Sequence, residues 1–262
     1  MGSFLNVVID RLPVMLQRQW RMHALETLNI EPPRASRFNL ALPRSHCPAC
    51  GTVVKAVHNV PVISWIALRG RCAHCDAPIP VRLPVVELAG ALLAVAVIGV
   101  WGLHWIALAY YVFLMVLLAS ALIDAETTLL PDQLTLPLLW LGLLVAAALE
   151  ATPTLFDAVA GAVFGYLSLW LVYWAFRIAT RREGMGYGDF KLMGAIGAWL
   201  GWQTAPAVIL IAALLGLAYA IVRLLRRTAT RGTPIPFGPF LAIAATAVLF
   251  VTARSATLLV IE

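Results

Sequence analysis

Seven apolar segments constrain the fold of this chain more than any other feature of its sequence. They lie at 84–101, 104–123, 133–149, 155–177, 190–202, 204–222 and 237–259. Several approach the roughly 20 residues that an α-helix needs to cross a bilayer. Charged residues make up only 12% of the sequence, against roughly 25% in a soluble domain. The pattern predicts an all-α polytopic membrane protein with about seven visible transmembrane helices.

The first nine residues, MGSFLNVVI, are apolar but too few to cross a bilayer. They have neither the basic start nor the cleavage site of a signal peptide. The segment is typical of the last turns of a span, so we expect a truncated eighth helix at the N-terminus. We also expect the native start to lie upstream of Met1.

The basic residues mark one side of the membrane. Of the 19 Lys and Arg, ten lie between Arg11 and Arg82, four between Arg177 and Lys191, and four between Arg223 and Arg231. The alternate turns, near 102, 150–154 and 203, contain none. The positive-inside rule then places the segment 10–83 in the cytoplasm. This topology explains the net charge of +6, and we expect no nucleic-acid partner.

All four cysteines lie in this cytoplasmic segment, in the pairs CPAC and CAHC. They are Cys47, Cys50, Cys72 and Cys75. Two C-x-x-C pairs at this spacing are typical of a tetrahedral zinc site. Disulfides are the alternative, but a cytoplasmic segment is reducing. His46 and His74 flank the pairs and could replace a cysteine, although with four thiolates available we expect surface histidines. A closed Cys₄ shell predicts structural zinc.

Four carboxylates lie at the cytoplasmic ends of apolar segments: Asp124, Glu126, Asp132 and Asp189. A charge at membrane depth is costly and marks a candidate functional site. Asp132 precedes an apolar run, which favours a helix cap. Glu126 is expected to be solvated, and Asp189 could also be a cap. Asp124 follows about twenty apolar residues, where a solvated anchor would more usually be Lys or Arg.

Two aspartates brought together from different helices can share one proton, because two like charges in close contact cannot both ionise. Such a pair can activate a water and polarise a peptide carbonyl, as in an aspartic protease. The glycines of GMGYGD at 184–189 would let a substrate backbone approach closely, since they carry no side chain.

The chain resembles the type IV prepilin peptidases, which are bifunctional leader peptidases and N-methyltransferases of the GxGD class of intramembrane aspartyl proteases. The matching stretches are GSFLNVVIDRLP at 2–13, FNLALPRSHCPACG at 38–51, NVPVISWIALRGRCAHCDAPIPVRLPVVEL at 59–88, IDAETTLLPDQLTLPLLWLGLL at 123–144 and GMGYGDFKLMGAIGAWLGW at 184–202. They cover most of the chain in the family's order.

The resemblance implies that Asp124 and Asp189 are the catalytic aspartates and that the four cysteines bind zinc. It implies cleavage of the basic leader of type IV prepilins and type II secretion pseudopilins at the cytoplasmic face of the bacterial inner membrane. The new N-terminal residue would then be methylated with S-adenosylmethionine, whose site the sequence does not reveal. The expected organisation is a span remnant at 1–9, a zinc-binding domain at 10–83 and a membrane protease domain at 84–262.

Two other functions fit the composition. An ion-coupled transporter would also carry intramembrane acids, but an inverted repeat and acids near the bilayer midplane would be expected. A noncatalytic membrane assembly scaffold could use the zinc loop to dock a partner.

Overall fold

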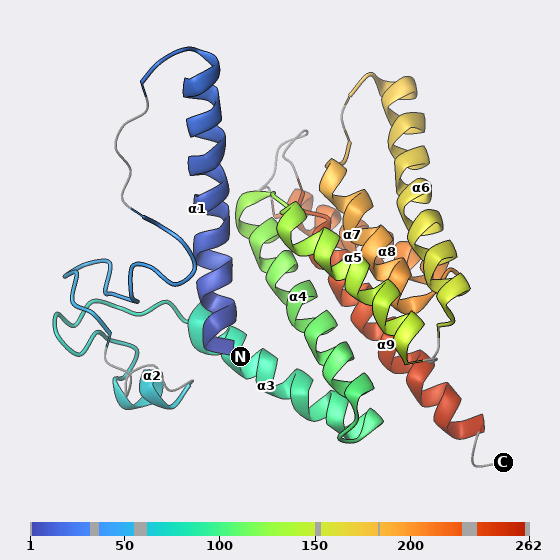
Figure 1. Cartoon of the computed structure of the whole chain (residues 1–262), viewed down its shortest axis with the longest axis horizontal. Coiled ribbons are helices and arrows are strands. Elements are labelled where there is room, and N and C mark those ends of the chain that lie inside the picture. Colours follow the sequence, from blue (N-terminus) through green and yellow to red (C-terminus); the bar gives the residue numbers. More distant parts are fainter. Residues whose placement is uncertain are drawn as a thin grey trace. The chain divides into compact units, whose positions relative to one another are not determined.

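The structure of the chain, a computed structural model, describes residues 2–31, 37–54, 62–149, 153–182, 184–226 and 235–259. These residues form nine helices and no named strand (Figure 1). The helices are α1 (Gly2–Thr27), α2 (Ile63–Ala67), α3 (Arg82–Trp101), α4 (Trp105–Thr127), α5 (Asp132–Ala148), α6 (Leu155–Thr180), α7 (Tyr187–Leu200), α8 (Ala205–Leu225) and α9 (Gly238–Leu259). The chain divides into two compact units, Met1–Ala96 and Val97–Glu262.

Each of the seven predicted apolar segments is a helix, from α3 to α9, so the all-α class is confirmed. Within the described residues, four helices are long and apolar enough to cross a membrane: α3, α4, α6 and α8. The apolar parts of α5 and α9 are shorter, and α7 has only 14 residues, or about 21 Å at 1.5 Å per residue. The structure thus supports four spans, and the count of seven or eight stays a prediction.

In the first unit, the N-terminal apolar segment and the polar residues after it form one helix, α1, which runs through Asp10 to Thr27. Its buried residues include Leu5, Ile9, Leu12 and Leu16, which recur at the three- and four-residue spacing of one helix face. The helix beyond Asp10 was not predicted from the sequence, because most residues after Leu16 are polar or charged. The packing boundary after Ala96 also differs from the domain boundary at 83, which stays a prediction.

The second unit is built around α7, whose residues from Asp189 to Trp199 are buried except for Lys191. Glycines let α6 and α7 approach closely. Gly161 and Gly197 meet backbone to backbone, and a Cβ on Gly165 would lie 2.6 Å from the Met193 carbonyl oxygen. Small residues at such spacing allow this contact in membrane helices.

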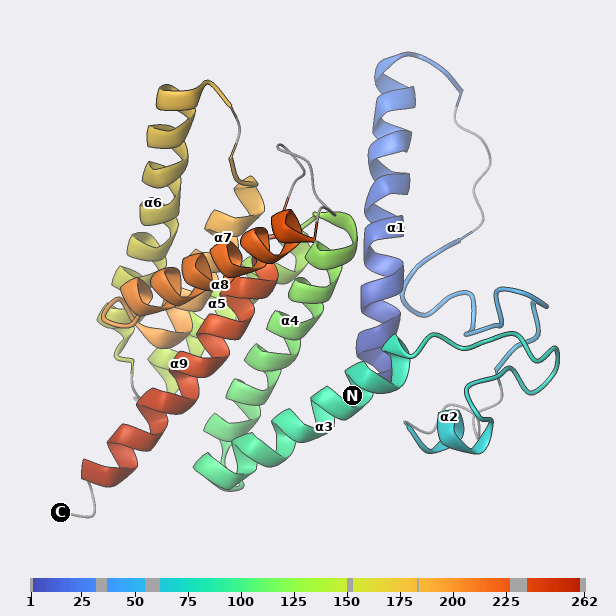
Figure 2. The same ribbon diagram turned by 180° about the vertical axis from the view of Figure 1, so that it is seen from behind.

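Trp199 fixes the other side of α7 against α4 and α5. Its Nε1 donates a hydrogen bond to the Leu138 carbonyl at 2.8 Å, and its ring stacks on Phe113 with centroids 4.9 Å apart. α9 packs against α4, α7 and α8, and Figure 2 shows α8 and α9 from behind. The C-terminus of α4 and the N-termini of α5, α7 and α9 therefore share one end of this unit (Figure 1).

Candidate active site and metal centre

Asp124 lies in the last turn of α4 and is only 5% exposed. Its Oδ2 accepts a hydrogen bond from the Gly238 backbone N–H at 2.8 Å. A Cβ added to Gly238 would lie 2.8 Å from the same oxygen, so the contact requires a glycine at the start of α9. The carboxylate is thereby fixed by a residue 114 positions away.

The Asp124 contact offsets an unfavourable position. A carboxylate near a helix C-terminus faces the negative end of the helix dipole. Here the positive N-terminus of α9 approaches it, and a helix N-terminus binds anions through its unpaired N–H groups. The pairing of two helix ends thus permits a carboxylate at a place that α4 alone would disfavour.

Asp189 lies in the first turn of α7 and is 6% exposed. Its Oδ2 accepts a hydrogen bond from the Gly186 backbone N–H at 3.2 Å. Gly186 holds the N-cap position of α7, so Asp189 is not the N-cap and instead contributes this one capping bond from the third helical residue. Its Oδ1 is buried and has no hydrogen-bond partner in the described part of the chain. A buried polar atom without a partner is rare, so this oxygen retains an unused capacity to accept a hydrogen bond.

The two aspartates lie close enough for the charge on Asp124 to act on Asp189. The structure thus brings together the two residues that the sequence analysis singled out. Two buried carboxylates that feel each other's charge hold one proton between them more readily than none or two. A carboxylate and a carboxylic acid side by side can act as base and acid in one step.

Asp132 does not cap α5, contrary to the sequence interpretation. The N-cap position is Pro131 and carries no side-chain capping bond. Asp132 instead accepts hydrogen bonds on both carboxylate oxygens from Lys191 Nζ, each at 2.7 Å. The lysine of the GYGDFK stretch therefore ties the start of α5 to α7, two residues beyond Asp189. Glu126 is exposed, as expected, but lies in the last turn of α4.

The glycine before Asp189 serves the fold of the protein itself. A Cβ on Gly188 would lie 2.6 Å from the Leu130 Cβ, so Leu130 occupies the space that was expected to admit a substrate backbone. Gly186 is exposed, and the one atom near its Cβ position is Asp189 Oδ2, at 3.5 Å. The expectation of close substrate approach is thus wrong at Gly188 and stays open at Gly186.

The two cysteine pairs, in the first unit, form two turns with the same hydrogen bonds. Cys47 N–H donates to the Thr52 carbonyl at 2.9 Å, and Cys72 N–H donates to the Ala77 carbonyl at 2.8 Å. Each turn is closed by an antiparallel bridge, His46 with Val53 and Arg71 with Pro78. In each, the residue after the second cysteine has positive φ, 70° at Gly51 and 54° at Asp76.

The four thiols form one cluster and no disulfide. Their Sγ atoms all lie within 4.8 Å of one another, and Cys47 Sγ and Cys75 Sγ are 3.8 Å apart. A tetrahedral zinc with Zn–S bonds of about 2.3 Å would separate its sulfurs by about 3.8 Å. The cluster can therefore hold a metal ion, and the disulfide alternative is wrong in this structure. His46 and His74 are exposed and lie outside the cluster.

Hydrogen bonds with Thr52 lower the pKa of the Cys50 thiol to about 6. Hydrogen bonds from the backbone N–H groups of His74 and Cys75 lower the pKa of the Cys72 thiol. The Ala77 N–H lowers the pKa of Cys75, but contacts with the other thiols and burial outweigh it and raise that pKa to about 12. The pKa values of neighbouring thiols shift in opposite directions, because the first thiolates to form repel the ionisation of the others.

Comparison with known proteins identifies the family of the chain. Residues 1–101 match the bacterial peptidase A24 N-terminal domain, and residues 111–221 match the type IV leader peptidase family. The chain is 52% identical over 244 residues to a protein of Pseudomonas aeruginosa named prepilin leader peptidase/N-methyltransferase, covering 93% of this chain and 84% of the relative. The chain belongs to the type IV leader peptidase family.

Other members of the family carry the same name. A relative from Aeromonas hydrophila is 51% identical over 249 residues, with 93% of this chain and 84% of the relative covered. One from Burkholderia pseudomallei is 47% identical over 257 residues, with 95% and 81% covered. No solved structure matches the chain.

Sequence reasoning did not identify Gly238 as part of the site. The run IPFGPF at 235–240 predicts the start of a helix, since proline and glycine precede an apolar segment. Nothing in the sequence links that start to Asp124, because the contact forms only when α4 and α9 pack.

Proposed function

We propose that this chain is a bifunctional membrane enzyme that cleaves the basic leader from type IV prepilins and type II secretion pseudopilins and then N-methylates the new N-terminal residue. The observation that carries the peptidase part is the pair Asp124 and Asp189. Both carboxylates are nearly buried, each accepts a backbone N–H from a helix start, and Asp189 Oδ1 is left without a protein partner among the described residues.

In the proposed hydrolysis, the ionised carboxylate of the pair takes a proton from a water held between them, and the water oxygen attacks the scissile carbonyl. The protonated carboxyl donates a hydrogen bond to the carbonyl oxygen and stabilises its developing negative charge. When the tetrahedral species collapses, the C–N bond breaks and the leaving amine takes up a proton. The pair then again holds one proton.

The surrounding residues position this pair. The Gly238 and Gly186 N–H groups each occupy one carboxylate oxygen, which limits rotation of both side chains and leaves their other oxygens for the reaction. Fixed geometry of this kind lowers the barrier because the reacting groups need not be ordered during the reaction. The Lys191 and Asp132 ion pair holds α7 in register with α5.

Zinc is the metal that we propose for Cys47, Cys50, Cys72 and Cys75. The cluster offers four thiolates and no open position, so the ion would be structural and would not act as a Lewis acid. It would tie together two turns 25 residues apart. Because metal binding is then linked to folding, the ion would stabilise the first unit.

S-adenosylmethionine, when bound, supplies an activated methyl group. The chain must bind this donor, hold the new N-terminal amine without its proton and align the two. None of these tasks needs the aspartate pair, so the two activities are separable.

The proposed location is the bacterial inner membrane, with several spans and with the cysteine segment and the aspartates at the cytoplasmic face. Basic residues gather in the segment 10–83 and beside the end of the second unit that holds the aspartates, and the opposite turns have none. The proposed domains are 10–83 for zinc and 84–262 for proteolysis.

The test is incubation of the purified protein with a prepilin, with and without S-adenosylmethionine, followed by mass spectrometry. We expect removal of the leader in both reactions and one added methyl group only with the donor. An intact prepilin after incubation with folded, metal-loaded protein contradicts the peptidase assignment. A trimmed but unmethylated product in the presence of donor contradicts the methyltransferase assignment.

A further inference from the structure

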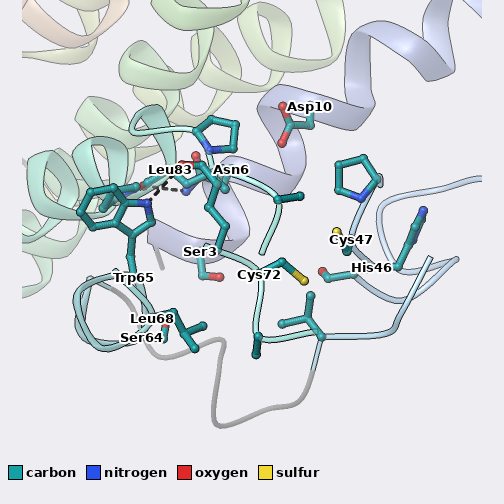
Figure 3. Close-up of a pocket in the computed structure, with 18 of the residues that line it drawn as sticks. Ser3, Asn6, Asp10, His46, Cys47, Ser64, Trp65, Leu68, Cys72 and Leu83 are labelled. Atoms are coloured by element: carbon teal, nitrogen blue, oxygen red, sulfur yellow. Dashed lines mark hydrogen bonds between the residues drawn. The ribbon is translucent and has the colours of Figure 1, made fainter. Parts of the chain in front are cut away.

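A cavity of about 630 Å³ lies in the first compact unit. Its walls come from the first half of α1, from α2, from the start of α3 and from the two cysteine turns (Figure 3). We call it the α1–α2 pocket. Residues that define it are Asn6, Asp10, Cys47, Trp65, Cys72 and Glu87. Its volume falls within the roughly 300–1,000 Å³ typical of small-molecule sites.

Asn6 lines this pocket and has a side-chain oxygen without a hydrogen-bond partner among the described residues. The residue is only 6% exposed, and its Nδ2 donates a hydrogen bond to the Leu83 carbonyl at 3.0 Å. That bond fixes which end of the amide is the oxygen. Oδ1 is buried and has no hydrogen-bond partner in the described part of the chain. A buried acceptor without a partner costs about 1–3 kcal/mol, so a bound donor would relieve a real penalty.

Trp65 adds a flat aromatic wall. Its Nε1 donates to the Ile79 carbonyl at 3.3 Å, which holds the ring in place beside Asn6 (Figure 3). The ring also packs over Gly70, where a Cβ would lie 2.8 Å from it. A fixed indole next to a buried amide oxygen suits a flat heterocycle that carries an amino group.

One carboxylate of the pocket, Glu87, can face a positively charged group of a ligand. Glu87 Oε2 accepts a hydrogen bond from the Val62 N–H at 2.9 Å, which fixes the carboxylate at the wall. Asp10 is paired with Arg82, so its charge is already balanced. Arg11 is directed to the loop carbonyls of Asn39 and Pro43. Among the described residues, the bond of Glu87 is to a neutral N–H, so its charge can interact with a positive group on a ligand.

We propose that the α1–α2 pocket is the site that binds S-adenosylmethionine for the methyl transfer proposed above. The donor combines the features that the pocket matches: an adenine ring with an amino group, a ribose with two hydroxyls, and a sulfonium and an ammonium group that carry positive charge. Asn6 Oδ1 accepts from one of its N–H or O–H groups, Trp65 contacts the adenine, and Glu87 faces positive charge. The inference rests on the proposed methyltransferase function.

Binding of tritiated S-adenosylmethionine, measured by equilibrium dialysis on the full zinc-loaded chain, tests the site without relying on turnover. Asn6→Leu keeps the number of side-chain heavy atoms and removes the acceptor, together with the donor to the Leu83 carbonyl. We expect the Kd to rise about tenfold, as for the loss of one buried hydrogen bond. Glu87→Gln keeps an oxygen for the Val62 N–H and removes the charge. We expect its Kd to rise about five- to tenfold.

Glu26→Gln is the matched control, since it removes the same charge from the exposed end of α1, outside the pocket. It should bind the donor as the parent does. Prepilin cleavage by each variant reports whether the second unit is intact. Equal Kd values for the parent, Asn6→Leu and Glu87→Gln overturn the proposal, and so does a Kd raised equally by Glu26→Gln.

Photolabelling locates the site even where a variant fails to fold. Irradiation of the parent with the tritiated donor should label the tryptic peptide 56–69, which contains Trp65, and excess S-adenosylhomocysteine should prevent it. Label confined to peptides of 97–262 overturns the pocket while the methyltransferase function stands. A parent that cleaves prepilin but neither binds nor uses the donor overturns the function, and the pocket assignment falls with it.

Discussion

The aspartate site and the cysteine site of this chain are built in opposite ways. The cysteine ligands come from two short turns, each closed by hydrogen bonds between residues four and five apart, and three of the four thiols are at least partly exposed. The aspartates come from helix ends that are distant in sequence, are nearly buried and are fixed by the starts of two helices.

The difference shows what each site needs from the rest of the fold. A metal ion can organise its own ligands, because its bonds are strong and short turns already place the sulfurs. A carboxylate pair has no such centre. It depends on helices that pack correctly, since burial and helix termini set its protonation.

Loss of either aspartate should give the largest effect. Asp124→Asn and Asp189→Asn each leave a single titratable carboxyl, so the site cannot hold an ionised base and a protonated acid at the same time, and prepilin cleavage should fall by about 10²–10⁴-fold or more. Methylation of an already trimmed peptide should persist, because it needs no carboxylate pair. Mass spectrometry of both reactions measures the outcome.

Glu126→Gln, in the same turn as Asp124 but exposed, is the control and should retain cleavage. If Glu126→Gln abolishes cleavage while Asp124→Asn retains it, the assignment of the first aspartate is wrong.

Removal of the cysteine ligands should break the first unit and spare the second. Cys47→Ser combined with Cys50→Ser leaves two ligands, so bound zinc should fall from about one per chain to none, because two thiolates cannot form the tetrahedral shell. Metal analysis checks the stoichiometry, and limited proteolysis should show new cuts between 37 and 81 but not in 105–149. An unchanged proteolysis pattern, or a parent protein without zinc, would refute a structural metal.

A methyl group on Gly238, at the start of α9, should displace the Asp124 carboxylate. Gly238→Ala places a Cβ 2.8 Å from Asp124 Oδ2, so the carboxylate must move. Displacement of a reacting group by about 1 Å can cost about 10²-fold, and we expect cleavage to fall about 10- to 100-fold.

Gly216→Ala is the matched control in the same unit, since its nearest neighbour would be Phe240 at 3.4 Å. Cleavage assays on both variants in membranes decide the matter. Equal activity of the two variants would mean that the Gly238 contact does not position Asp124.

The smallest effect should come from the ion pair of Lys191 and Asp132. Its side chains are 32% and 49% exposed, and exposed pairs contribute about 0.2–1 kcal/mol because water screens them. Lys191→Gln and Asp132→Asn should each lower cleavage less than about fivefold. A double-mutant cycle on cleavage rates should show the two effects to be non-additive, and strictly additive losses would contradict a shared role.

Features that form locally, such as the apolar helices and the cysteine turns, could be predicted from the sequence, whereas the contacts between distant helices could not. The seven apolar segments became α3 to α9 because a long apolar run in a chain of this composition has few other stable states. The cysteine spacing predicted a cluster, and the sulfurs do meet, since both turns are local. The second half of α1 was not predicted, because most of its residues after Leu16 are polar or charged.

At the aspartate site, the sequence alone singled out Asp124 and Asp189 as candidates, because a carboxylate beside an apolar segment is costly. Only the tertiary structure decided how they are held. Asp132 was expected to cap α5 and instead binds Lys191, and Gly188 admits Leu130 where a substrate was expected. The Gly238 N–H reaches Asp124 across 114 residues. Such contacts depend on the rotation and depth at which helices pack, which side-chain spacing along one helix does not fix.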